Sequence, residues 1–218
     1  RLLVVANKVI AIEKDRELIP LLQEKFASYV TTGILTLIEA DVLEFDPSTI
    51  KESYKLIANI PYYITGAIIE QFLSTTTQPS QMVLLVQKEV AERIVARDGK
   101  QSIPSIAVQA YGHASIVAKV RAGAFNPPPK VDSAILLIEN INRSFFTDCD
   151  ESLFLKILKA LFGKKRKQIG RSLGEFLGDK GRALHILSQC AIDPRTRPED
   201  IDLDVWKTLV QAIQNTEN

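Results

Sequence analysis

The sequence predicts an α/β protein with an open, mostly parallel sheet, followed by a small all-helical domain. Two observations lead to this prediction. As far as Asn140, short apolar runs of strand length alternate with helical segments of about ten residues, which is typical of right-handed βαβ crossovers. After Asn140 no apolar run of strand character returns, and apolar residues recur only at helical spacing.

The expected elements follow in order along the chain. Residues 1–7 are similar to the end of a helix. The expected strands are the apolar runs 8–13, 34–41, 54–59, 82–87, 115–120 and 131–139. Helices are expected between them at 18–26, 65–73 and 89–96, with a polar loop at 98–103. Helical periods then recur at 153–162, 169–177, 183–190 and 205–213, so we place a domain boundary near residues 141–150.

The composition is that of a globular protein and excludes several classes. Apolar residues make up 46% of the 218 residues and charged residues 24%, which excludes a disordered chain and a low-complexity fibre. The net charge of +1 excludes a protein that wraps nucleic acid with its whole surface. No apolar run approaches the ~20 residues of a membrane helix. Cys149 and Cys190 have no His or Cys partner at metal-binding spacing, which favours a reducing, cytoplasmic compartment and argues against a zinc site.

Positive charge is concentrated at the start of the helical part. Residues 151–180 contain 8 basic and 3 acidic side chains, a net charge of +5, whereas residues 1–150 contain 15 basic and 17 acidic ones. A positive face on a near-neutral protein suits the docking of a polyanion. The alternative is a helix face that is simply solvated.

Three polar residues, Glu13, Asp41 and Asn59, stand at the ends of three successive expected strands. In an open parallel sheet, ligands bind beyond the carboxyl ends of the strands. A carboxylate there can accept hydrogen bonds from both hydroxyls of a ribose, and a second one can accept from the exocyclic amine of an adenine. Together the three residues predict a site for a nucleoside-bearing cofactor. Each of them alone is weak evidence, because strand ends are often polar for solubility.

The segment Asn59-Ile60-Pro61-Tyr62 is the most specific feature of the sequence. An adenine N6 amine is a poor nucleophile because its lone pair is delocalised into the ring. Two acceptors on its hydrogens, the Asn59 side-chain oxygen and the Ile60 carbonyl, would favour a pyramidal nitrogen with a localised lone pair. Tyr62 would stack on the base, and the chemistry would rest on positioning and electrostatic stabilisation. The alternative is a plain Asn-Pro turn with a core tyrosine.

A second stiff segment, Phe125-Asn-Pro-Pro-Pro-Lys130, follows the fifth expected strand. Three consecutive prolines favour polyproline II and limit the freedom of the backbone. Such a loop can hold Phe125 as a second stacking wall for a base pulled out of its stack. The alternative is a rigid surface crossover with Phe125 in the core.

Together these features resemble the KsgA-type ribosomal RNA adenine dimethyltransferases, over essentially the whole chain. The resemblance implies a Rossmann-like S-adenosylmethionine-dependent methyltransferase sheet with a small C-terminal all-helical domain. It implies an enzyme that places two methyl groups on N6 of each of two adjacent adenines near the 3′ end of small-subunit rRNA. It rests on Glu13, Asp41, Asn-Ile-Pro-Tyr at 59–62, Gln-Lys-Glu at 87–89, Phe-Asn-Pro-Pro-Pro-Lys-Val-Asp-Ser at 125–133 and Lys-Arg-Lys-Gln-Ile-Gly-Arg-Ser-Leu at 165–173.

The resemblance also implies roles for individual residues. Residues 1–145 would form the methyltransferase catalytic domain and residues 146–218 a helical RNA-docking domain. The implied catalytic residues are Asn59, Ile60, Pro61, Tyr62 and Phe125, with the two rings sandwiching the target base. The implied cofactor-binding residues are Glu13 at the ribose, Asp41 at the adenine, Lys14, Val42 and Asn59. The implied RNA-binding residues are Lys130, Lys164, Lys165, Arg166, Lys167 and Arg171.

The implied partner is small-subunit rRNA in a ribosomal particle, with no metal and no membrane, and the protein is expected to be a monomer. The family opens with a Gln/His-Asn-Phe-Leu segment and a glycine-rich loop that approaches the methionine end of the cofactor. Neither is found in this sequence, and residues 1–5 look like the far end of the helix that follows the loop. We therefore interpret the catalytic domain as N-terminally incomplete.

Two other functions stay open. The macrolide-resistance type has the same chemistry but acts on large-subunit rRNA; the triple proline after Phe125 and the basic helical tail favour the small-subunit class. A non-catalytic ribosome-assembly or transcription factor would keep the fold and the RNA surface. The retention of Glu13, Asp41, Asn59 and Tyr62 argues against that second alternative.

Overall fold

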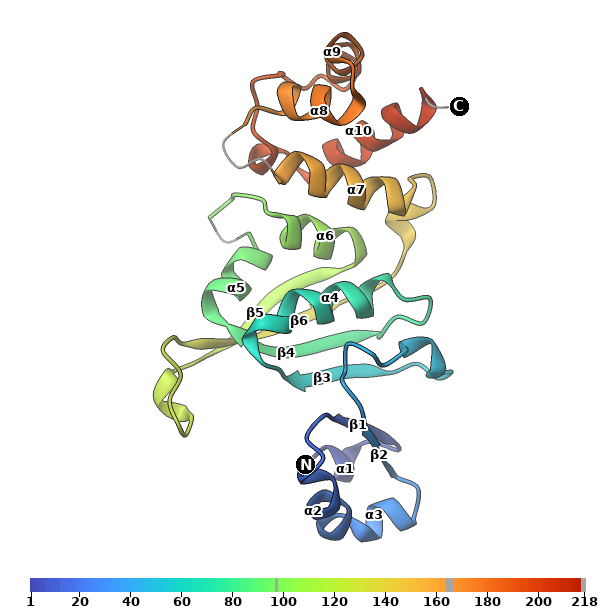
Figure 1. Cartoon of the computed structure of the whole chain (residues 1–218), viewed down its shortest axis with the longest axis vertical. Helices are drawn as coiled ribbons and strands as arrows, with labels where there is room; N and C mark the ends of the chain where they lie inside the picture. The colour runs from blue at the N-terminus through green and yellow to red at the C-terminus, as the bar shows by residue number, and fades with distance from the viewer. Residues whose placement is uncertain (97, 164–166, 217–218) are drawn as a thin grey trace. The chain divides into compact units, whose positions relative to one another are not determined.

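The computed structural model describes residues 1–96, 98–163 and 167–216, and the chain divides into two compact units, Arg1–Thr49 and Ile50–Asn218. Each unit has its own sheet, and Figure 1 shows the course of the chain through both. The division falls at residue 49 rather than near residues 141–150. The functional domains 1–145 and 146–218 therefore stay a prediction.

The first unit is a two-stranded parallel sheet with three short helices. β1 (Val9–Glu13) pairs with β2 (Leu35–Glu39), and the register sets Glu13 beside Glu39. Gly33 turns the chain into β2 with a φ of +74°, a left-handed conformation that favours glycine. The helices are α1 (Leu2–Val5), α2 (Leu18–Lys25) and α3 (Ala27–Thr31). The structure confirms both predicted strands and the predicted helix at 18–26, whereas α3 is not predicted by the sequence.

The second unit is built on a four-stranded sheet in the order β3–β4–β6–β5. Its strands are β3 (Lys55–Asn59), β4 (Gln81–Gln87), β5 (His113–Val120) and β6 (Ser133–Glu139). β3 and β4 are parallel, whereas β6 is antiparallel to both β4 and β5. The prediction of a mostly parallel sheet is therefore wrong for this unit, although the α/β class is confirmed. The physical reason is the connection 121–132, which joins β5 to β6 without the crossover α-helix that parallel neighbours need.

Helices cover one face of this second sheet, and the core lies between the two layers (Figure 1). Along β4 the buried residues Met82, Leu84 and Val86 alternate with partly exposed ones, as expected of a strand with one face against a core. In β6, Leu136 and Ile138 are buried in the same alternation. The covering helices are α4 (Thr65–Ser74), α5 (Lys88–Ile94) and α6 (Ile103–Tyr111).

The sequence does not predict α6. A capping box begins this helix: the Ser105 backbone N–H donates to Ser102 Oγ at 3.2 Å, and the Ser102 N–H donates to Ser105 Oγ at 2.7 Å. Ile106, Val108 and Tyr111 are all buried, so burial is not confined to one stripe of the helix. A helix covered on several sides lacks the apolar period by which helices are recognised in a sequence.

Within the described residues, four α-helices follow β6 and no strand comes after it, as predicted. Asp150 and Asp179 cap α7 and α9 through their side-chain oxygens. Trp206 of α10 is fully buried and stacks on Phe162 of α7, with ring centroids 5.7 Å apart. The helices are α7 (Glu151–Phe162), α8 (Ile169–Leu177), α9 (Lys180–Gln189) and α10 (Leu203–Asn215).

A polar network ties α7 to the α/β part of the second unit. The Tyr111 hydroxyl donates to Glu151 Oε1 at 2.5 Å, and Arg143 Nη2 donates to the same oxygen at 2.6 Å. Burial and the neighbouring Glu151 carboxylate raise the pKa of Tyr111, so this hydroxyl stays a donor over the physiological range. The network joins Tyr111, 40 residues earlier in the chain, and the nearby Arg143 to the first turn of α7.

Both cysteines are free, and burial raises the pKa of the Cys149 thiol to about 11. A thiol of that kind is protonated and unreactive at neutral pH. Across the described ranges, no three metal-binding side chains come together. Within the same ranges, no helix combines the length and the apolar character that a bilayer crossing requires.

Candidate active site

Asn59 is the last residue of β3, and its side chain is exposed beyond the carboxyl end of that strand. The next residue, Ile60, is 8% exposed and anchors the turn in the core. Pro61 then holds an extended backbone (φ −57°, ψ 134°), and a single 3-10 turn, Tyr62–Ile64, leads into α4. The Asn59 side chain is therefore exposed to solvent, while the buried Ile60 and the stiff Pro61 fix the backbone that follows it. A polar amide on a braced strand end is suited to positioning a substrate.

Tyr62 is tethered at its tip. Its hydroxyl hydrogen-bonds Ser133 Oγ at 2.8 Å, and Ser133, the first residue of β6, is fully buried. The Tyr62 carbonyl accepts from Thr65 Oγ1 at 3.1 Å. The ring is half-buried, so part of it is available to a ligand. The sequence does not reveal this role of Ser133, because no local pattern indicates a hydrogen bond across 71 positions.

The loop that carries Phe125 is held by Asp132. The Asp132 carboxylate accepts from the Ala122 backbone N–H at 3.0 Å, and the Asp132 carbonyl accepts from the Lys88 N–H at 3.0 Å. These bonds join the two ends of the loop and fasten it to the start of α5. Phe125 is half-buried and makes no aromatic ring contact with the described residues.

The structure brings the two predicted aromatic residues to connected segments. Tyr62 is bonded to Ser133, which directly follows the Phe125 loop and its anchor Asp132. The two rings are not in contact with each other. A pair of separate rings on two braced loops is compatible with a flat group entering between them.

In the first unit, the predicted cofactor residues lie at the ends of adjacent strands. Glu13 ends β1, and its Oε1 accepts from the Asp15 N–H at 2.8 Å, which leaves Oε2 without a hydrogen-bond partner among the described residues. Asp41 accepts from Lys14 Nζ at 2.7 Å and from the Leu43 N–H at 3.0 Å. The Lys14 ammonium, followed by the Leu43 N–H, holds the pKa of Asp41 below its usual range. Asp41 is therefore ionised at neutral pH and acts only as an acceptor.

The remaining member of this set, Val42, directly follows Asp41 and is partly exposed. The structure thus brings Glu13, Lys14, Asp41 and Val42 together at one edge of the first sheet, as parallel pairing of β1 and β2 requires.

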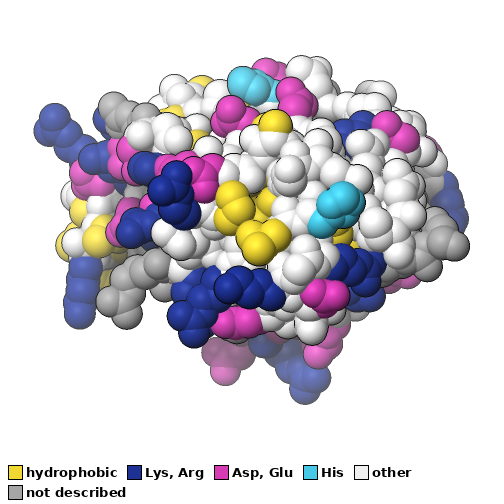
Figure 2. All heavy atoms as spheres, turned by 90° about the horizontal axis from the view of Figure 1, so that it is seen from above, with side chains coloured by type: hydrophobic (Ala, Val, Ile, Leu, Met, Phe, Trp, Pro, Cys, Tyr) yellow, Lys and Arg dark blue, Asp and Glu magenta, His cyan; other side chains and the backbone are white. Residues whose placement is uncertain are grey.

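The predicted RNA-binding residues are dispersed. Lys164, Lys165 and Arg166 lie outside the described residues. Lys167 Nζ lies 3.2 Å and Arg171 Nε 3.1 Å from the same carboxylate oxygen, Glu175 Oε1 on α8. Lys130 is exposed on the loop between β5 and β6, and Figure 1 shows that loop and α8 at different ends of the second unit. In the view onto the helical end, Lys and Arg side chains alternate with Asp and Glu instead of forming one uninterrupted patch (Figure 2).

Residues 1–215 match the family described as ribosomal RNA adenine dimethylase. A relative from Dehalococcoides mccartyi (strain BAV1), named ribosomal RNA small subunit methyltransferase A, is 41% identical over 208 residues, which cover 94% of this chain and 70% of the relative. A relative of the same name from Enterococcus faecalis is 35% identical over 219 residues and covers 96% of this chain and 74% of the relative.

Two solved structures have the same fold. A dimethyladenosine transferase from Plasmodium falciparum superposes with a TM-score of 0.82 at 25% identity, over 99% of this chain and 85% of that one. The 23S rRNA methyltransferase ErmE superposes with a TM-score of 0.72 at 22% identity, over 98% and 84%. The second likeness concerns the fold alone, whereas the family match and the curated relatives extend over nearly the whole sequence. The chain belongs to the ribosomal RNA adenine dimethylase family.

Proposed function

We propose that this protein transfers methyl groups from S-adenosylmethionine to N6 of two adjacent adenines near the 3′ end of small-subunit rRNA. The observation that supports the proposal most strongly is the set of relatives named small subunit methyltransferase A, 39–42% identical to this chain in three Dehalococcoides mccartyi strains. The exposed Asn59 at the end of β3, with Tyr62 braced beside it, supplies groups suited to that chemistry.

The proposed role of Asn59 is to prepare the amine of the target adenine. Its side-chain oxygen and the Ile60 carbonyl accept the two N6 hydrogens, which favours a localised lone pair on nitrogen. S-adenosylmethionine, when bound, supplies a methyl group on a positively charged sulfur. Asn59 and Ile60 would hold the amine nitrogen toward that methyl group, and the N6 proton displaced by each incoming methyl group would leave to solvent. Neither acceptor needs a shifted pKa, since both act by position and electrostatics.

Tyr62 and Phe125 are proposed to hold the target base from its two faces. The Tyr62–Ser133 hydrogen bond and the Asp132 contacts brace the two loops, so the rings lose little freedom when a base enters. Base–aromatic stacking contributes about 1–3 kcal/mol per base, which offsets a large part of the cost of pulling an adenine out of its stack. Pro61 contributes through the stiffness of the turn between Asn59 and Tyr62.

The carboxylates of the first unit offer hydrogen-bond acceptors that suit a nucleoside-bearing cofactor. Glu13 Oε2 is available to accept from the hydroxyls of a ribose. Asp41 already accepts two hydrogen bonds, but its two oxygens offer about four lone-pair positions, so it can also accept from an adenine amine. Lys14 and Val42 lie beside these two carboxylates along the chain. These residues are the ones we propose to bind S-adenosylmethionine in this unit.

RNA docking is proposed for the helical end, residues 146–218, with Lys130 as a further contact on the second unit. Lys167 and Arg171 share the Glu175 carboxylate, and a phosphate group could compete with that acid for both cations. We also propose that the substrate is a ribosomal particle and that the protein acts as a monomer. Duplex RNA is read mostly by shape, which an assembled particle presents and short naked RNA does not.

A competition between ribosomal subunits tests the proposal. Unmethylated small subunits and unmethylated large subunits are mixed with labelled S-adenosylmethionine and the protein, and the label in each rRNA is counted. We expect label in small-subunit rRNA only. Label confined to large-subunit rRNA would support the macrolide-resistance type instead, and binding to particles without any label would support a non-catalytic assembly factor.

A further inference from the structure

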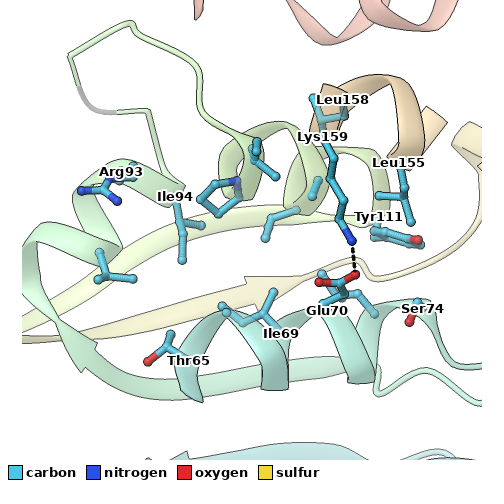
Figure 3. Close-up of a pocket in the computed structure, with 17 residues that line it drawn as sticks. Thr65, Ile69, Glu70, Ser74, Arg93, Ile94, Tyr111, Leu155, Leu158 and Lys159 are labelled. Carbon is cyan, nitrogen blue, oxygen red and sulfur yellow. Dashed lines mark hydrogen bonds and ion pairs between the residues drawn. The ribbon is translucent and has the colours of Figure 1, made fainter. Parts of the chain in front are cut away.

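A largely apolar cavity of about 320 Å³, partly open to solvent, is lined by residues of α4, α5, α6 and α7 in the second unit (Figure 3). Its walls include Ile69 of α4, Ile94 of α5, Val108 of α6 and Leu158 of α7. Ligand pockets commonly have volumes of about 300–1,000 Å³. An apolar cavity of only ~150 Å³ stays dry and binds benzene, because water gains no hydrogen bonds there. The present cavity is therefore large enough for an organic molecule and unattractive to water.

The charged residues at its edge are already paired. Figure 3 shows Lys159 reaching from α7 to Glu70 on α4, with Nζ 2.8 Å from Oε1. Arg93 Nη2 lies 3.0 Å from Glu89 Oε1, one turn away on α5. The side chains of both pairs are more than half exposed, so their charges face solvent at the rim. A charged ligand inside the cavity would find no counter-charge among the apolar walls, and burying an unpaired charge is costly. A neutral, apolar molecule would leave both pairs intact and displace only weakly held water.

From this lining we propose that the cavity is a binding site for an uncharged, apolar small molecule about the size of one or two fused rings. The site goes beyond the proposed methyl transfer, since no residue of the Asn59–Tyr62 segment lines the cavity. It is nevertheless coupled to that segment through one contact. Thr65 lines the cavity, and its hydroxyl donates to the Tyr62 carbonyl at 3.1 Å. A bound molecule that bridges α4 and α7 is expected to slow amide hydrogen exchange in both helices.

The test is a titration of the full chain followed by methyl NMR. The probe is indole, which is neutral, and the two charged analogues are indole-3-acetate and tryptamine. Indole is expected to give saturable shifts at the methyl groups of Ile69, Ile94 and Leu158. The dissociation constants of the anion and the cation should be at least ~10-fold larger, equivalent to ~1.4 kcal/mol.

A pair of matched variants locates the site. Ala107 lines the cavity on α6, so Ala107→Leu fills part of the space, whereas Ala67 is exposed on α4 and is not a lining residue. Ala107→Leu should abolish the saturable indole shifts, and Ala67→Leu should retain them. Three results would each overturn the proposal: no saturable shift in the unmodified chain, equal binding of indole by both variants, or a charged analogue that binds as tightly as indole.

Discussion

The loop after β3 and the strand ends of the first unit hold their polar side chains by opposite means. Tyr62 is fixed by a hydrogen bond to a fully buried serine, Ser133. Asp41 is fixed by Lys14, whose side chain is 74% exposed. A buried hydrogen bond is costly to break because the polar group left behind has no other hydrogen-bond partner. When an exposed ion pair breaks, water hydrates both charged groups. The proposed base-holding loop at Tyr62 is therefore expected to be rigid. The side chains at the proposed cofactor-binding edge are expected to rearrange more easily.

The largest expected effect is at Asn59, which lies just before the rigid Tyr62 turn. Asn59→Ala removes one of the two proposed acceptors for the N6 hydrogens and should lower the rate of methyl transfer by ~10²-fold or more, the scale for one positioned polar group. Binding of small-subunit particles should change little, which a filter-binding assay checks. Asn59→Asp keeps an acceptor oxygen and should retain more activity than Asn59→Ala. Near-normal methylation by Asn59→Ala would refute the role.

The next effect concerns the rings. Phe125→Leu or Tyr62→Leu keeps apolar bulk and removes the stacking face. Each should lower kcat/KM by a factor equivalent to about 1–3 kcal/mol, since base–aromatic stacking contributes that much. Tyr63→Leu is the control, because Tyr63 lies beside Tyr62 and is 87% exposed. Unmodified rates for both ring variants would mean that the rings only fill space.

The brace itself can be weakened without touching the ring. Tyr62→Phe leaves the buried Ser133 hydroxyl without its partner and should lower the free energy of unfolding by about 1–3 kcal/mol in urea titration. Adding Ser133→Ala removes the orphaned hydroxyl and should recover part of that loss. Tyr63→Phe should be neutral. Additive effects of Tyr62→Phe and Ser133→Ala would contradict the proposed brace.

At the helical end the expected effect is on salt dependence. Replacing Lys167 and Arg171 with Gln should lower the slope of log affinity against log salt by about one unit per lost phosphate contact. Lys119→Gln, on an exposed position of β5, serves as the control. An unchanged slope in the double variant would mean that these two cations serve Glu175 and not RNA.

The smallest effect is expected at the adaptable edge. Lys14 holds the pKa of Asp41 below its usual range, so the pair stabilises the fold above the ordinary Asp pKa of ~3.9 and stops doing so as the pH falls through the lower, folded value. Lys14→Met should move the Asp41 pKa back toward its usual range, as read from carboxyl carbon NMR. Lys8→Met, at an exposed position before β1, should leave it unchanged. No shift in Lys14→Met would assign the low pKa to the Leu43 N–H instead.

Much of the fold follows from local pattern. The apolar runs predict all six strands, β1 to β6, within two residues at each end, and aspartate caps accompany the predicted helices α7 and α9. What the pattern misses is non-local. The insertion of β6 between β4 and β5 depends on pairing between distant strands, and α6 is buried on several sides and so lacks an amphipathic period.

The site divides in the same way. Asn59, Tyr62 and Phe125 stand out because stiff, unusual segments surround them in the sequence. The contacts that hold the site side chains cannot be recognised in the sequence, because the Tyr62–Ser133 and Lys14–Asp41 contacts join positions 71 and 27 residues apart. A pairing of that kind depends on strand register, which short-range spacing does not encode.

The measurement that tests the central proposal most directly is mass mapping of the product. Unmethylated small subunits are incubated with the protein and S-adenosylmethionine, the rRNA is digested, and the masses of the 3′-terminal fragments are determined. We expect two adjacent adenines that each gain two methyl groups, with the yield of both at a fixed early time lowered by ~10²-fold or more in Asn59→Ala. Methyl groups at any other base or position, or on the same adenines in the Asn59→Ala variant at equal yield, would contradict it.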